Sequence, residues 1–125
     1  MLRADAWGAY AAEAAVELLI AHEWWLHRDD FVNTFVATDP TGSDMPAAWI
    51  DWSGAVAALD AGRLPCSSGE AQVLRVAASI AAGVPVDLRD ALCGLDVDTV
   101  ASVVRAVAHV GGYRDATVTV SGARR

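Results

Sequence analysis

Residues 67–85 read SSGEAQVLRVAASIAAGVP and carry the clearest helix signals in the chain. Ser67 and Glu70 have the spacing of a capping box, in which the serine hydroxyl accepts from the backbone N–H of the glutamate and the carboxylate accepts from the amide of the serine. Gly83, with Pro85 just beyond it, is typical of a helix end. The apolar residues between these signals occupy one broad face, which predicts a helix packed against a core: Val73, Leu74, Ala77, Ala78, Ile80 and Ala81.

The N-terminal segment predicts the longest helix, from about Asp5 to His27. Its apolar residues follow one another at steps of three and four, as on the buried stripe of an amphipathic helix. Glu13 and Glu17 mark a wetter face of the same helix. The stripe that we expect to face the core contains Trp7, Tyr10, Ala14, Leu18, Ala21 and Trp25.

Acidic or hydroxyl caps and glycine stops divide the rest of the chain into shorter helices. Asp29 or Asp30 is expected to cap a short helix that contains Phe31 and Phe35, and residues 39–44 read DPTGSD, which predicts a loop. The other predicted helices are one over 55–61 after Asp51 or Ser53 with Gly62 as its stop, a short one from Asp87 to Cys93, and one from about Thr99 to Val110 after Asp96 or Asp98.

These segments predict an all-α fold, a compact bundle of about four longer helices with one or two short ones. We expect one helical domain over residues 1–115. Residues 116–120 read ATVTV, which alternates like a β-strand, so residues 116–125 are expected to form a tail or a short strand.

The charge of the chain is negative and unevenly distributed. The 125 residues carry a formal net charge of −7, and all nine basic residues are arginine. Residues 1–60 hold ten acidic residues against two arginines, whereas residues 61–125 hold six against seven. Nonspecific attraction to a polyanion is therefore not expected as the main activity. Solvated helix faces account for most such asymmetry, although an acidic half can also steer a basic partner.

The sequence predicts a soluble, cytoplasmic protein. The longest stretch without Asp, Glu or Arg, residues 76–86, is well short of the roughly 20 apolar residues that a membrane-spanning helix requires. Asp5, Glu13 and Glu17 interrupt the apolar run that a secretory signal would need.

No catalytic signature, cofactor site or metal site is predicted. His22-Glu23-Trp24-Trp25-Leu26-His27 resembles the zinc-binding HExxH motif, but histidines five residues apart lie about 140° apart around a helix and cannot share a metal easily. The chain has no GxSxG elbow, and without lysine it has no phosphate-binding GxxxxGK[ST] loop. His109 is interpreted as a hydrogen-bonded boundary residue.

The two cysteines form no CxxC pair, so neither a metal knuckle nor a thioredoxin-type redox motif is predicted. Cys93 lies among apolar residues and is predicted to be a small core residue. Cys66 precedes a helix start, where the helix dipole can stabilise a thiolate, and is the better candidate for a reactive thiol.

All five tryptophans fall within the first 52 residues, in the acidic half of the chain. A partly exposed tryptophan surrounded by carboxylates is typical of a protein interface. We therefore predict a partner-binding surface made of Trp24, Trp49, Trp52, Glu23, Asp29 and Asp30. The alternative for Trp24 is that it packs beneath the Phe31 and Phe35 segment or stacks on Arg28 one turn later.

Part of the sequence resembles small uncharacterised proteins from high-GC actinobacteria. The residues that carry this resemblance are 64–70 (LPCSSGE), 84–92 (VPVDLRDAL) and 94–96 (GLD). The resemblance covers about half of the chain. It implies a bacterial cytosolic origin and no catalytic residues, because no activity is established for that group.

The function that these observations predict is a non-enzymatic protein–protein interaction module, a homo-oligomer or a small adaptor, with a protein partner or self-association and no membrane. The alternative is a DNA-binding regulator of the helix-turn-helix kind, built from the C-terminal helices with Arg105 and Arg114 as nucleic-acid contacts. Few polar or basic side chains lie on the predicted recognition helix, so nucleic acid is the less expected partner.

Overall fold

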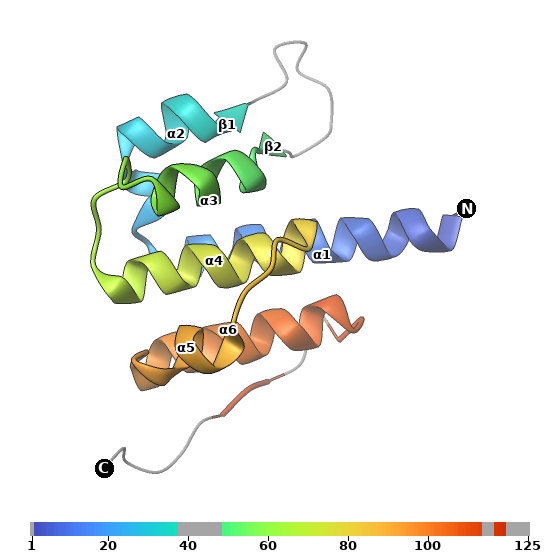
Figure 1. The fold of residues 1–125 in the computed structure, drawn as a ribbon. Coiled ribbons are helices and arrows are strands. Elements are labelled where there is room, and N and C mark those ends of the chain that lie inside the picture. Colours follow the sequence, from blue (N-terminus) through green and yellow to red (C-terminus); the bar gives the residue numbers. More distant parts are fainter. Residues whose placement is uncertain (1, 38–48, 114–116, 120–125) are drawn as a thin grey trace.

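The computed structural model describes the backbone of residues 2–37, 49–113 and 117–119, and the side chains of residues 10–36, 50–113 and 117–119. The fold is an all-α bundle, which confirms the predicted class (Figure 1). The elements are α1 (Leu2–His22), the 3₁₀ turn η1 (Trp25–His27), α2 (Asp29–Phe35), β1 (Val36–Ala37), β2 (Trp49–Ile50), α3 (Trp52–Asp60), α4 (Ser68–Ala82), α5 (Leu88–Cys93) and α6 (Val97–Val110).

Helix α4 lies at the centre of the bundle and packs on α1, α3, α5 and α6. Figure 1 shows α2 and α3 on one side of the α1 and α4 pair, with α5 and α6 on the other side. Helix α6 also packs along α1. Its end lies near the middle of α1, where His109 contacts Glu13, and its start lines a cleft with His22 at the end of α1, so the two helices are antiparallel.

The core is formed where these helices meet. Its largest fully buried side chains are Trp25, Phe31, Leu18, Leu19, Leu74 and Val73. Each contributes about 1.5–3 kcal/mol or more relative to an exposed position, so these contacts dominate the stability of the bundle.

The predicted caps of α3, α4, α5 and α6 are confirmed. The Ser67 hydroxyl accepts from the Glu70 amide at 3.2 Å, and the Glu70 carboxylate accepts from the Ser67 amide at 2.8 Å. Gly83 ends α4 with φ of 70°, a left-handed conformation that glycine adopts without steric cost. The aspartates that precede the other three C-terminal helices also accept from backbone amides of the first turn: Asp51, Asp87 and Asp96.

Helix α1 ends at His22, five residues before the predicted end. The Glu23 amide still donates to Leu19 and Ile20, both at 3.1 Å, but Glu23 itself has φ of 57°. This left-handed residue turns the chain into η1. The turn places Trp25 in the core, as predicted, with its indole N–H donating to the carbonyl oxygen of Glu70 at 2.8 Å.

The predicted core stripe of α1 is only partly confirmed. Ala14 and Leu18 are buried, but Tyr10 is half-buried. Ala21 is exposed, one residue before the last residue of α1. The side chain of Trp7 lies outside the described residues.

Two further local predictions are wrong. Arg28 occupies the N-cap position of α2 without a side-chain capping hydrogen bond, and Asp29 and Asp30 lie in the first helical turn. Cys93 is exposed, because α5 is short and buries only Ala91.

A short antiparallel ladder, which the sequence analysis did not predict, joins the end of α2 to the start of α3. Val36 pairs with Ile50, and Ala37 pairs with Trp49. The loop predicted over 39–44 lies outside the described residues. Residues 117–119 have no regular structure, so the strand predicted over 116–120 is not formed in its described part.

Candidate functional site

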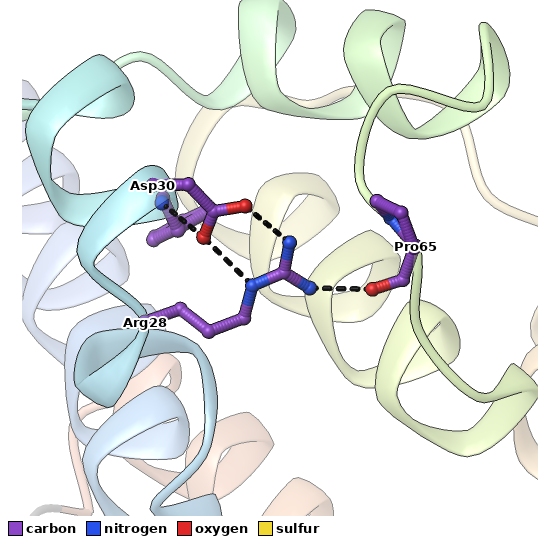
Figure 2. Close-up of polar contacts among 4 residues, drawn as sticks. Arg28, Asp30 and Pro65 are labelled. Carbon is purple, nitrogen blue, oxygen red and sulfur yellow. Dashed lines mark hydrogen bonds and ion pairs between the residues drawn. The ribbon is translucent and has the colours of Figure 1, made fainter.

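Arg28, at the start of α2, reaches Pro65 in the connection that leads into α4 (Figure 2). Its Nε donates to Asp30 Oδ1 at 2.8 Å, its Nη2 contacts the other oxygen of that carboxylate, and its Nη1 donates to the Pro65 carbonyl at 2.5 Å. The fork geometry of a guanidinium is suited to holding a carboxylate in this way. Arg28 therefore fastens the start of α2 to a segment 37 residues away in the sequence.

These contacts occupy the carboxylate of Asp30, which was predicted to lie on the partner-binding surface. The hydrogen bonds from Arg28 lower the pKa of Asp30 and raise the pKa of Arg28 itself. Asp30 also accepts from the Phe31 amide at 2.8 Å. The Asp30 side chain is 55% exposed, but its carboxylate is already bonded to Arg28 and to the start of α2.

The predicted tryptophan surface is not assembled as expected. Trp52 is 8% exposed and belongs to the core, so its assignment to a contact surface is wrong. Trp24 is half-buried, with its ring edge-to-face against Trp25 at 4.7 Å and the Arg28 guanidinium 5.0 Å from its centre. Stacking on Arg28, the alternative for Trp24, is therefore confirmed. The side chain of Trp49 lies outside the described residues.

Three of the predicted contact residues are exposed and acidic. They are Glu23, Asp29 and Asp30, and His27 between them is exposed as well. A face of this kind attracts cations and basic segments. Because Trp52 is buried and Arg28 lies over Trp24, these acids do not surround a described, open aromatic anchor.

A second cluster joins α1 to α6 and was missed by the sequence analysis. His109 is 4% exposed, with Nε2 2.8 Å from Glu13 Oε1 and Nδ1 3.4 Å from Glu17 Oε1. The hydrogen bond expected of His109 is confirmed, and its burial exceeds that of a boundary residue. Glu13 and Glu17 are one helical turn apart, but His109 is 96 residues from Glu13, so no local pattern in the sequence indicates the contact.

This cluster contains the residue types that can hold a divalent cation. One ligand atom from each of Glu13, Glu17 and His109 lies within 4.8 Å of the others. Imidazole and carboxylate suit zinc and similar metals. The hydrogen bond between His109 and Glu13, with the close approach of Glu17, accounts for the same geometry and gives the cluster a structural role at the helix contact.

A cleft of about 310 Å³ opens between the end of α1 and the start of α6. Its polar lining comprises His22, Asp96, Asp98, Thr99 and Ser102. Asp96 already accepts from the Thr99 amide at 2.9 Å, and the hydrogen bonds from Thr99 lower the pKa of this carboxylate. Because Asp96 serves as the cap of α6, its presence in the cleft follows from the helix start.

The thiol chemistry expected at Cys66 is not favoured. Burial and the neighbouring Glu70 raise the pKa of the Cys66 thiol, in spite of Arg28 and Arg75 nearby. A reactive cysteine needs the opposite shift, because the thiolate is the nucleophile.

On its outer face, helix α6 carries three of the six large apolar side chains that are exposed in the described part of the chain. Val97, Val104 and Val107 are 41%, 45% and 59% exposed. The other large apolar side chains exposed in the described part of the chain are spread over different segments: Ile20, Leu88 and Tyr113.

The same face bears on the nucleic-acid alternative. Arg105 is exposed on α6, but it lies beside these valines and seven residues, about two helical turns, after the acidic Asp98. A recognition helix needs several polar or basic side chains facing outward. Arg114 lies outside the described residues.

Comparisons with protein-family models, with curated proteins and with solved structures find no match to this chain. Within the described residues, no helix combines the length and the apolar character needed to cross a membrane.

Proposed function

We propose that this chain is a non-enzymatic protein–protein interaction module that self-associates through the outer face of α6. The observation that carries the proposal is the exposure of Val97, Val104 and Val107 on one helix. Exposed apolar residues that gather on one face are typical of interaction sites, whereas single ones are common on any surface.

Charge supports a second copy of the same chain as the occupant of this face. The chain is strongly acidic, and copies that met through the N-terminal half would bring like charges together. The outer face of α6 carries one acidic and one basic exposed side chain, Asp98 and Arg105. A contact at this face therefore avoids most of the repulsion between the two acidic halves.

The expected association is weak. Helix α6 has 14 residues and is about 21 Å long, so a contact confined to it is smaller than the roughly 1,600 Å² of a standard interface. We expect a dissociation constant on the order of micromolar or weaker.

The proposal is tested by size-exclusion chromatography with light scattering at high micromolar protein concentration. The wild type is expected to approach twice the monomer mass, and the double variant Val104→Ser/Val107→Ser is expected to remain monomeric. Serine and valine have similar helix propensities, so this variant changes the surface more than the helix. The matched control is Leu88→Ser, which removes an equally exposed apolar side chain from α5 and should leave association unchanged.

A monomeric wild type in this experiment would overturn the proposal, as would a dimer that survives the double valine substitution. In the second case the acidic surface around Glu23 and Asp29 becomes the next candidate. The DNA-binding alternative predicts salt-sensitive retention of DNA that is lost when Arg105 and Arg114 are replaced.

A further inference from the structure

The distribution of side chains around α6 is asymmetric. At about 100° per residue, Val97, Ala101, Val104 and Ala108 form a stripe roughly 60° wide along the exposed side of the helix. Asp98 and Arg105 lie about 70–90° from the centre of this stripe on one flank, and Val100 and Val107 lie at a similar angle on the other flank. One flank is therefore charged and the other is apolar.

We infer that two copies of α6 pair antiparallel, so that Asp98 of each copy lies beside Arg105 of the other. This inference rests on the proposed function and adds the orientation of the partner. The inference is based on the arrangement around α6, where the stripe of alanine and valine has a charged flank on one side and an apolar flank on the other.

The symmetry of a dimer relates the flanks to the helix direction. When two facing helices are antiparallel about a two-fold axis that crosses them, each flank meets the same flank of the other copy. The charged flank then meets the charged flank, and Val100 and Val107 meet their counterparts. In a parallel pair, each charged flank would lie against the apolar flank of the partner, which leaves its charges without partners and desolvates them.

Reversing the direction also matches the signs of the charges. Asp98 lies near the start of α6, and Arg105 lies seven residues further on, about 10 Å along the axis. In the antiparallel pair, the Asp98 end of one copy meets the Arg105 end of the other, and the symmetry produces this contact twice. The alanines in the stripe allow the two backbones to approach near the lower end of the usual 8–10 Å interaxial range.

Charge reversal tests the orientation. Arg105→Asp and Asp98→Arg each turn both contacts into like-charge pairs, and each is expected to weaken self-association on the order of tenfold in sedimentation equilibrium. An equimolar mixture of the two variants opposes positive flanks to negative flanks, and should associate at least as tightly as the wild type. Arg89→Asp, an exposed substitution of the same charge change on α5, is the control and should have little effect.

Cysteine cross-linking gives a second measurement that does not depend on the charges. In a background with Cys66→Ser and Cys93→Ser, a chain with Val97→Cys is expected to cross-link to a chain with Ala108→Cys. Chains with Val97→Cys alone should not cross-link to each other, because in the antiparallel pair that sets Asp98 beside Arg105 those positions are about 14 Å apart along the axis.

The outcomes separate the orientation from the proposed function. Rescue in the mixture together with cross-linking of Val97→Cys to Ala108→Cys supports the antiparallel pair. A wild-type dimer that requires Val104 and Val107, but shows no rescue and cross-links through Val97→Cys alone, overturns the orientation and leaves self-association through α6 standing. A wild type that is monomeric at every concentration overturns both.

Discussion

Replacing Trp25 with phenylalanine should destabilise the protein more than the same replacement one residue earlier. The Trp25 side chain is fully buried, and its indole N–H donates to the Glu70 carbonyl oxygen at 2.8 Å. Phenylalanine fills less of the site and has no donor. The Glu70 carbonyl lies in α4 and keeps its helical hydrogen bond, so the lost hydrogen bond costs about 0.5–1.5 kcal/mol, and the residual cavity adds about 1 kcal/mol.

The expected loss for Trp25→Phe is therefore about 1.5–2.5 kcal/mol of the free energy of unfolding. The matched control is Trp24→Phe, because Trp24 is only half-buried and its replacement keeps an aromatic ring beneath Arg28. We expect that control to cost less than about 1 kcal/mol.

Urea unfolding followed by far-ultraviolet circular dichroism measures both variants on the same scale, since that signal does not depend on the tryptophan that is removed. Equal losses for the two variants, or a loss below about 1 kcal/mol for Trp25→Phe, would refute the role of Trp25 as the hydrogen-bonded centre of the core.

Four further outcomes follow from local contacts. Ser67→Ala removes the capping box and should lower the free energy of unfolding by about 1 kcal/mol in urea titration, whereas no change would show that α4 does not need its cap. Arg28→Lys keeps the charge but loses the fork, and a cost of about 1–2 kcal/mol in the same assay is expected; full retention of stability would contradict the clamp. The folded pKa of Asp96 is lowered, so its stabilisation is present above the ordinary carboxyl pKa and lost as the pH falls through the folded value; Asp96→Asn should flatten that acid limb of the stability profile, and an unchanged limb would argue against it. A thiol reagent at mildly alkaline pH should modify Cys93 before Cys66, because Cys93 is exposed while burial and Glu70 raise the pKa of Cys66, and mass spectrometry of the labelled peptides would reveal the reverse order.

The helix boundaries that could be predicted are those set by neighbours in the sequence. Ser67 and Glu70 bond one another within a single turn, and Gly83 supplies the left-handed residue that ends α4. Such signals depend on side chains reaching their own backbone, so a single sequence contains them.

The end of α1 could not be predicted in this way, because it depends on distant contacts. Trp25 leaves the helical path to reach Glu70, 45 residues away, and Arg28 reaches Pro65. Helical periodicity through Trp25 indicated a buried residue correctly, but it could not show that Glu23 would adopt a left-handed conformation and break the helix.

The candidate surface was harder to predict than the core. The sequence identified tryptophans as interface anchors, and Trp52 instead became part of the packing of α3. Helix α6 is apolar on more than one side, and its pattern alone does not tell which side packs on α1 and α4. The exposed fractions of Val104 and Val107 show which side faces outward. The sequence alone does not contain this information, because it depends on how the whole bundle assembles.

The most direct test of self-association through α6 is a dilution series of the ¹⁵N-labelled protein followed by amide chemical shifts, from about 1 mM to about 20 µM. The proposed dimer predicts concentration-dependent shifts that concentrate between Val97 and Ala108 and leave Glu23 and Asp29 unchanged. Spectra that do not change on dilution, or changes centred on Glu23 and Asp29, would contradict it.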